Sequence, residues 1–417
     1  MRILFVGVGY VHYFNQILNK LNELPGLEVF NLIPLDDASS HVGPAVYQTL
    51  DNVKHQVLRL PSSIDAAGQV RFQHLESLLA EIGPKVIIAT EVYLSQFYDN
   101  PAVSALIASS DIKIILKDIP FRLPKFTDEL QVISSLARSY VGRLNRLLKY
   151  LPVSPVLNQL LYRTFNYRQD LERLYLKKLT LNKVDAHVCY VEAAYDIYAS
   201  YGVPAEKIFI TYNSPDTDEL FAIRARLASV APILAPCPHR LIHVGRLTDN
   251  KRVDLIIKAL SQIKEKYTDA QLLVIGYGPE AAALKTLTAE LQLSGSVTFL
   301  GGIYDYNLLG RYFLASSVYV MAYLGGISLN DAMSFGKPVI CSTGDGTEQK
   351  LVREGINGLY FEIGSAASLA EKISYLFEHP ETLARMGEES TKIIQNEVNI
   401  HTVADGFTKA FDYVTNN

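Results

Sequence analysis

Features that mark several protein classes are absent from this sequence. The 417 residues contain only three cysteines, Cys189, Cys237 and Cys341, which lie too far apart for a metal-binding motif or a disulfide framework. The formal net charge of −4 gives no general attraction to nucleic acid. No apolar run approaches the roughly 18 residues that a membrane span requires. We therefore expect a cytoplasmic protein that does not bind nucleic acid.

Residues 1–14 could be mistaken for a signal peptide, because a single charge, Arg2, precedes an apolar run. No small-residue cleavage site follows, and residues 14–21 continue directly as an amphipathic stretch. A first buried strand is therefore the better interpretation of this segment.

What the sequence does contain is a regular alternation of short apolar strands and helical patterns, which is typical of parallel α/β structure. In the first half, the expected strands cover residues 3–8, 28–33, 86–90, 113–116, 186–190 and 208–212. In the second half, they cover residues 241–244, 272–275, 297–300, 318–321, 338–340 and 358–361. The chain is long enough for two domains of about 200 residues each. We predict an α/β fold with two facing Rossmann-like domains.

A proline-rich stretch marks the expected domain boundary. Four prolines fall within residues 213–238, which indicates a linker with a helical piece inside it. The predicted divisions are an N-terminal domain at 1–213, a linker at 214–238, a C-terminal domain at 239–395 and a C-terminal helix at 396–417. This helix is amphipathic, and we expect it to cross back to the first domain.

Two cations follow the first strand of the second half. Parallel α/β units bind ligands beyond the carboxyl ends of their strands, so a cleft between two such units is the expected site. The chain turns at Gly245, and Arg246 and Lys251 follow, five positions apart, with a helix expected to open at Lys251. A planar guanidinium and a compact ammonium beside a helix N-terminus suit a diphosphate. Taken alone, the pair is more simply explained as two surface cations.

A glycine-rich loop follows the strand at 318–321. Gly325 and Gly326 would let the backbone approach a ligand closely. A helix is expected to start at Ile327, with free N–H groups that point at the ligand. Asp331 lies one turn further on the same face as Ile327 and Ser328, where its carboxylate can accept both hydroxyls of a ribose. The alternative is a tight turn followed by a surface charge.

The order of motifs in the second half resembles the retaining family-4 glycosyltransferases of the GT-B fold. The matching segments are Gly-Arg-x4-Lys at 245–251, Gly-x-Gly-Pro at 276–279, Phe-Leu-Gly at 299–301, the glycine-rich loop and Ala-Met at 325–333, Gly-x-Pro-Val-Ile at 336–340 and Glu-Gly-x-Asn-Gly-Leu at 354–359. The segment from Asn213 to Asp216 also resembles that family's signature between domains, whereas the rest of the first half matches only in outline.

The resemblance implies a hexosyl- or related glycosyltransferase that acts with retention. Its C-terminal domain would bind a UDP-, GDP- or other nucleotide-diphosphate sugar, and its N-terminal domain would bind a glycan or lipid-linked glycan acceptor. Arg246 and Lys251 would stabilise the leaving diphosphate. The expected donor-binding residues are Gly9, Tyr277, Ile303, Tyr323, Gly325, Gly326, Ile327, Ser328 and Asp331.

One position departs from the family pattern. The family usually carries two glutamates separated by seven residues in the glycine-rich loop, and this chain has Tyr323 and Asp331 there. Asp331 can keep the ribose role, but Tyr323 cannot act as a charged partner of the donor sugar, although its hydroxyl can hydrogen-bond. Two interpretations follow: an active enzyme with altered donor recognition, which we prefer, or a silent subunit that binds sugar nucleotides.

The first half offers fewer candidates. Gly9 lies in a partial dinucleotide fingerprint and is either a backbone contact to the donor phosphate or part of a simple turn. His12 is either a base or an acceptor contact, or it is simply a polar surface group. Asp118, after the strand at 113–116, is our candidate catalytic group on the acceptor side, and Glu91 is its competitor.

No metal or separate cofactor is expected. Asp216 and Asp218 form an Asp-x-Asp pair of the kind that holds a divalent metal in another glycosyltransferase fold, but they fall in the expected linker. Arg246 and Lys251 already supply positive charge for the diphosphate. An NAD-linked oxidoreductase, suggested by Gly7-x-Gly9 and the acids at 36–37, is disfavoured because the third glycine of the fingerprint is missing.

A basic stretch covers residues 122–178, with 11 Lys or Arg against four acids and many interleaved apolar residues. Such a surface can lie on anionic lipid at the inner face of the membrane, or it can consist of ordinary helices with solvated charges. Membrane contact would suit a lipid-linked acceptor.

Overall fold

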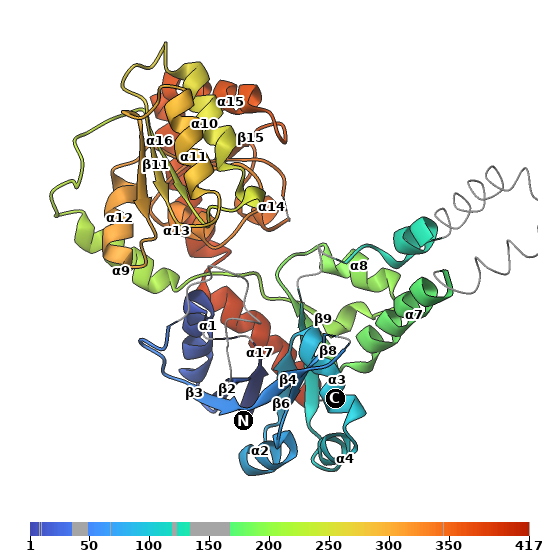
Figure 1. Ribbon diagram of the computed structural model, residues 1–417. Coiled ribbons are helices and arrows are strands. Elements are labelled where there is room, and N and C mark those ends of the chain that lie inside the picture. Colours follow the sequence, from blue (N-terminus) through green and yellow to red (C-terminus); the bar gives the residue numbers. More distant parts are fainter. Residues whose placement is uncertain are drawn as a thin grey trace, which may run out of the picture. The chain divides into compact units, whose positions relative to one another are not determined.

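The computed structural model describes residues 1–7, 9, 11–35, 49–66, 68–118, 123–133, 167–344 and 346–416. Its strands form a seven-stranded sheet, a six-stranded sheet and a two-stranded hairpin. Figure 1 shows these strands interleaved with helices along the chain, as the predicted α/β fold requires.

The first sheet has the strand order β3-β2-β1-β6-β7-β8-β9. Its strands are β1 (Arg2–Val6), β2 (Glu28–Pro34), β3 (Gln56–Leu60), β6 (Val86–Ala89), β7 (Lys113–Asp118), β8 (Ala186–Cys189) and β9 (Ile208–Ile210). The pairs β1–β6, β6–β7, β7–β8 and β8–β9 are parallel. All but β3 were predicted. The edge strand β3 is only partly buried, so its sequence lacks the continuous apolar run that marks a central parallel strand.

Short elements surround this sheet. The hairpin of β4 (Ser62–Ile64) and β5 (Val70–Phe72) is antiparallel and was not predicted, because three-residue strands carry little pattern. The described helices of the first half are α1 (His12–Asn22), α2 (Leu75–Ile82), α3 (Glu91–Asp99), α4 (Pro101–Ser109), α7 (Tyr167–Lys183) and α8 (Ala194–Ser200). The start of α4 follows from its sequence: Asn100 caps the N–H of Ala102 at 3.0 Å, and Pro101 occupies the first helical position.

The second sheet has the strand order β12-β11-β10-β13-β14-β15, and every neighbouring pair is parallel. Its strands are β10 (Arg240–Val244), β11 (Gln271–Ile275), β12 (Val297–Gly301), β13 (Val318–Met321), β14 (Val339–Cys341) and β15 (Gly358–Tyr360). The strand order reverses between β10 and β13. In an open parallel sheet, the loops at such a reversal diverge and leave room for a ligand.

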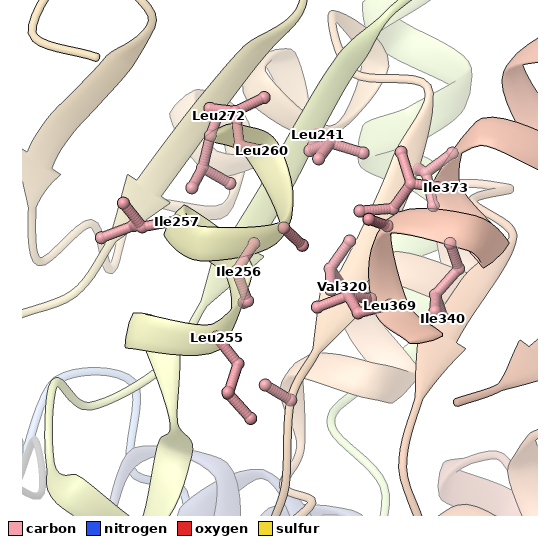
Figure 2. Packing of buried hydrophobic residues seen from close by; sticks show 14 of the residues in the cluster. Leu241, Leu255, Ile256, Ile257, Leu260, Leu272, Val320, Ile340, Leu369 and Ile373 are labelled. Carbon is pink, nitrogen blue, oxygen red and sulfur yellow. The ribbon is translucent and has the colours of Figure 1, made fainter. Parts of the chain in front are cut away.

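Two hydrophobic clusters cover the two faces of the second sheet. Leu241, Leu272 and Val320 pack on one face, and their neighbours Ile242 and Leu273 pack on the other, as the alternation of side chains along a strand requires. Figure 2 shows the first cluster, in which helices α10 (Val253–Ile263) and α15 (Ala366–Glu378) lie against these strands.

The other helices of the second half complete the Rossmann-like arrangement. They are α9 (Thr217–Leu227), α11 (Ala281–Glu290), α12 (Tyr306–Leu314), α13 (Ser328–Ser334), α14 (Thr347–Leu351), α16 (Pro380–Asn396) and α17 (Ile400–Asn416). Helix α9 is the helical piece expected within the linker. Its Leu220, Ile223 and Leu227 are buried in the core of the second sheet, so this stretch packs as part of that core.

Contacts divide the chain into two compact units. The first unit contains Met1–Gly7, Arg59–Thr211 and Gly406–Asn417, and the second contains Val8–Leu58 and Tyr212–Asp405. Helix α17 begins in the second unit and ends in the first, where Phe407 packs against Phe5 with ring centroids 5.7 Å apart. The final helix therefore returns to the first unit, as predicted. The domain boundaries expected from the sequence stay a prediction.

Among the residues that the structure describes, none of the helices combines the length and the apolar character needed to cross a membrane.

Candidate functional site

A cavity of about 340 Å³ lies where the strand order of the second sheet reverses. Its lining comes from the loops after β10, β11, β12 and β13 and from the start of α1, all of which belong to the second unit. The volume is in the range of small-molecule sites. Nine predicted residues line it: Arg246, Lys251, Tyr277, Ile303, Gly325, Gly326, Ile327, Ser328 and Asp331.

Glycines bring the loops after β10 and β11 into direct contact. The N–H of Leu247 donates to the carbonyl of Tyr277 at 2.9 Å. A Cβ atom at Gly276 would lie 1.8 Å from the Gly245 carbonyl oxygen, and φ at Gly276 is +146°. Only glycine fits this position. The close contact fixes the Gly245–Arg246 turn beside Tyr277.

Lys251 joins the loop after β10 to the glycine-rich loop after β13. Its Nζ donates to the carbonyl oxygens of Leu324 at 2.7 Å and Gly325 at 2.6 Å. The residue ends a 3₁₀ turn, Asp249–Lys251, and Arg252 adopts a left-handed φ of +48° before α10 begins at Val253. Helix α10 therefore begins at Val253, as the apolar pattern of residues 253–264 predicts, and not at Lys251 itself. The left-handed residue separates the turn from the helix.

Asp331 is buried in the first turn of α13, where its N–H donates to the Ile327 carbonyl at 3.1 Å. Only 4% of the residue is exposed, and its Oδ1 has no hydrogen-bond partner among the described residues. Burial raises the pKa of Asp331 to about 8, because desolvation disfavours the carboxylate. A buried acceptor without a donor is suited to the hydroxyl groups of a ligand.

Hydroxyl and aromatic side chains surround Asp331. The Tyr319 hydroxyl lies 2.8 Å from the Ser328 hydroxyl and donates to the Val244 carbonyl at 3.3 Å. The ring of Tyr306, which lines the cavity, is 5.4 Å from the ring of His12. Burial lowers the pKa of His12, and burial with the nearby Asp331 carboxyl raises the pKa of Tyr306 well above its usual range. The part of the cavity wall that His12 and Tyr306 form near the Asp331 carboxyl group is therefore aromatic.

Tyr304 and Tyr306 also line the cavity, although neither was predicted. The ring of Tyr304 meets that of Tyr277 edge-on, with centroids 6.3 Å apart, on either side of Gly302. Tyr304 and Tyr306 follow the carboxyl end of β12 directly, where parallel α/β sheets bind ligands, and this position could have predicted them. The Asp305 carboxylate, which caps the N–H of Asn307 at 2.8 Å, marks the helix start beside them.

Three predicted residues do not line this cavity. The Gly9 carbonyl accepts a hydrogen bond from Asn31 at 2.8 Å. Tyr323 is half-buried in the loop after β13, and Asp118 is the last residue of β7 in the first unit. Glu91, the competitor of Asp118, forms an ion pair with Lys177. The roles of Gly9, Tyr323 and Asp118 stay predictions.

Asp216 and Asp218 have structural partners. The Asp216 carboxylate caps the N–H of Glu219 at 3.1 Å, and Asp218 lies 3.2 Å from the ammonium group of Lys20. The described ranges contain no cluster of three or more His, Cys, Asp or Glu that could hold a metal ion. The acids at 36–37, which an NAD-linked enzyme would need, lie outside the described residues.

Comparison with known proteins finds a family match in the second half of the chain. Residues 235–393 match the model of the family Glycosyl transferases group 1. This match spans the whole second sheet and contains all nine of the predicted residues that line the cavity. It covers less than half of the chain. Together with the relatives described next, it supports a group 1 glycosyltransferase.

Curated relatives of the chain carry glycosyltransferase names. The putative glycosyltransferase EpsD of Bacillus subtilis is 29% identical over 154 residues, which cover 36% of this chain and 40% of that protein. The lipopolysaccharide core biosynthesis glycosyltransferase LpsE of Rhizobium meliloti is 27% identical over 229 residues, which cover 54% of this chain and 63% of that protein. The matched part thus spans between two fifths and two thirds of the length of these relatives.

Solved structures resemble the chain along its whole length. HepE of Anabaena, solved in complex with UDP, has a TM-score of 0.63 at 16% identity and covers 99% of this chain and 100% of its own. A glycosyltransferase of Rickettsia africae has a TM-score of 0.65 at 14% identity, with coverage of 100% and 99%. At these identities the likeness shows the fold, which is GT-B.

Proposed function

We propose that the protein transfers a sugar from a nucleotide-diphosphate donor to a glycan or lipid-linked glycan acceptor. The observation that carries this proposal is the cavity at the strand-order reversal, which brings Arg246, Lys251 and Asp331 together beside two glycine-rich loops. The UDP complex of the structural neighbour HepE supports a nucleotide ligand of this kind.

Arg246 and Lys251 would act on the leaving group. When the bond between the anomeric carbon and the phosphate oxygen breaks, negative charge develops on the diphosphate. Two fixed cations stabilise this developing charge in the transition state more strongly than they stabilise the intact donor. Because these cations meet the need for positive charge, the proposed reaction uses no metal ion and no cofactor.

Retention of the anomeric configuration is part of the proposal, as the family resemblance implies. The new bond forms between the acceptor oxygen and the anomeric carbon on the face that the diphosphate leaves. The proton of the acceptor hydroxyl passes to an oxygen of the leaving phosphate. The products are therefore the glycoside and the nucleoside diphosphate, and no carboxylate nucleophile is needed. Asp118 is the proposed acceptor-side group.

The nucleoside end of the donor would lie deeper in the cavity. The unpartnered Oδ1 of Asp331 is placed to accept a ribose hydroxyl. Tyr277 and Ile303 would border the base, and the N–H groups at Ile327 and Ser328 would face the phosphates.

A thermal-shift panel of sugar nucleotides tests the donor. A ligand that binds only the folded protein raises the apparent stability by mass action, by about 2.7 kcal/mol at one hundred times its dissociation constant. We expect the sugar nucleotides of one base, and the corresponding free nucleoside diphosphate, to raise the unfolding temperature of the protein. A panel in which no uridine, guanosine, adenosine or thymidine diphosphate shifts the transition would contradict the proposal.

The second candidate function is a silent sugar-nucleotide-binding subunit, and the position of Tyr323 favours it. A tyrosine replaces the carboxylate that the family directs to the donor sugar, so nucleotide binding can persist without transfer. Donor hydrolysis and transfer assays distinguish the two functions. Binding without either reaction would support the silent subunit.

We also propose peripheral contact with an anionic membrane through residues 122–178, at its cytoplasmic face. Arg122 and residues 134–166 lie outside the described residues. The described helix α7 supports the proposal, because Leu176 and Leu179 are 61% and 66% exposed and lie three positions apart on one face. Exposed leucines beside basic residues are typical of helices that bind lipid surfaces.

A further inference from the structure

Glu348 is a buried acid that the proposed reaction does not use. It lies on α14 and is 0% exposed. Its carboxylate accepts the N–H of Gly344 at 2.8 Å and the N–H of Gly346 at 3.1 Å. Charged side chains are rarely buried to this extent unless specific partners compensate for the lost hydration. Here backbone N–H groups are among the partners, so the carboxylate holds Gly344 and Gly346 in place.

That loop presses on the glycine-rich loop after β13. A Cβ atom built on Gly344 would lie 3.0 Å from the Tyr323 carbonyl oxygen and 3.2 Å from the Leu324 Cα. Real Cβ atoms rarely come so close, so the two backbones are in direct contact at this glycine.

The same segment of the glycine-rich loop holds Lys251. The carbonyl oxygens of Leu324 and Gly325 accept hydrogen bonds from Lys251 Nζ at 2.7 and 2.6 Å. A continuous series of contacts therefore runs from the Glu348 carboxylate through Gly344 and the Leu324 backbone to the ammonium group in the cavity.

We propose that Glu348 is a positioning residue that fixes Lys251 in the cavity. Hydrogen bonds from N–H groups to a carboxylate are stronger than those to a neutral acceptor, and burial strengthens them further. Gly344 is thereby held in place against the Leu324 backbone. The consequence for diphosphate binding rests on the proposed function, whereas the placement of Lys251 does not.

Glu348→Gln tests the placement directly. The amide keeps the shape of the side chain but removes the charge and turns an N–H group toward one of the loop N–H groups. The loop should relax, and Lys251 should lose its carbonyl partners. Brief acetylation of the whole protein with acetic anhydride, followed by peptide mass spectrometry, measures the reactivity of each lysine. We expect Lys251 to react several-fold faster in the variant.

Two internal comparisons separate positioning from general destabilisation. Lys337 is half-buried and donates to the Ser316 carbonyl at 2.7 Å, so its labelling rate reports loss of the surrounding structure. Glu389→Gln makes the same chemical change on α16, where the Glu389 carboxylate pairs with Lys392 at the surface. We expect Lys337 to stay protected in Glu348→Gln and Lys251 to stay protected in Glu389→Gln.

Gly344→Ala disturbs the same contact from the other side and leaves the carboxylate in place. Its methyl group would push on the Tyr323 carbonyl, so Lys251 should again react faster while Lys337 does not. An unchanged Lys251 rate in both variants overturns the proposal. Parallel increases at Lys251 and Lys337 also overturn it, because they would assign Glu348 to stability alone.

Titration with inorganic pyrophosphate adds the functional readout. We expect Glu348→Gln to bind pyrophosphate more weakly than wild type. If Glu348 acts through Lys251, Lys251→Met and the double variant Lys251→Met/Glu348→Gln should bind pyrophosphate with equal affinity. Equal affinity of wild type and Glu348→Gln would contradict the positioning role. A wild-type protein that binds neither pyrophosphate nor any sugar nucleotide would contradict the proposed function, while the labelling result would still decide the placement of Lys251.

Discussion

Asp331 combines two opposing properties in a single residue. Its carboxyl group is buried beside the cavity with an oxygen that lacks a donor, which disfavours the charged form in the empty protein. The same lack of a donor makes it a strong acceptor for a ligand hydroxyl. Residues that reduce stability in this way are concentrated at functional sites.

Asp331→Asn should stabilise the protein in alkaline solution. The pKa of Asp331 is raised to about 8 in the fold, against ~3.9 in an unfolded chain, so the folded state binds more protons between these values. The free energy of unfolding of the wild type therefore falls as the pH rises through this window. The asparagine variant cannot ionise and should escape this fall.

Urea unfolding at pH 4.5 and pH 8.5 measures the difference. We expect the variant to gain a few kcal/mol relative to wild type at the higher pH and nothing comparable at the lower pH. Binding of the nucleotide should weaken in the same variant. A variant less stable than wild type at both pH values would show that the carboxylate has a partner that stabilises it.

At the level of the secondary-structure elements, glycines mark the points where loops of the second sheet come into close contact. The loops after β10, β11 and β13 could be predicted from the order of their glycine motifs. Each glycine marks a position where close contact between backbones leaves no room for a side chain. The edge strand β3 and the β4–β5 hairpin escaped prediction because partial burial and short length remove the apolar pattern. Glu348 escaped because its partners are backbone N–H groups, which no residue pattern specifies.

Gly276→Ala should damage both the fold and the cavity. A methyl group at this position would lie 1.8 Å from the Gly245 carbonyl oxygen, and the φ of +146° is unfavourable for alanine. We expect a loss of roughly 2 kcal/mol or more in the free energy of unfolding, with weaker nucleotide binding.

Gly295→Ala is the matched control for this change. A Cβ atom at Gly295 would meet nothing within 4 Å, so this variant should keep the stability and the binding of wild type. Comparable unfolding midpoints for the two variants would contradict the inferred loop contact.

At the scale of the whole molecule, the sequence predicted two parallel α/β sheets and a final helix that returns to the first unit. The strand patterns carried this prediction, because buried parallel strands are apolar on both faces. The acceptor could not be predicted in the same way. Asp118 and His12, the candidate groups on the acceptor side, stand singly in the sequence and belong to no repeated motif.

The proposed membrane contact predicts a selective loss of vesicle binding. Leu176→Glu combined with Leu179→Glu should abolish cosedimentation with phosphatidylglycerol vesicles, because it replaces exposed apolar side chains with acids beside an anionic surface. Ile363→Glu changes an equally exposed apolar residue, 57% exposed, in the second unit and should have no effect. Equal binding by all three proteins, or a preference for phosphatidylcholine vesicles, would count against this surface.

In the proposed function, Arg246 and Lys251 bind the diphosphate of a sugar nucleotide. Calorimetric titration of the donor identified by thermal shift into wild type, Arg246→Ala and Lys251→Ala measures this binding, with Lys258→Ala on α10 as the control. Since a hydrogen bond to a charged group contributes ~1.5–3 kcal/mol, each of the two variants should bind at least about tenfold more weakly than wild type. Wild-type affinity in both variants would contradict the account.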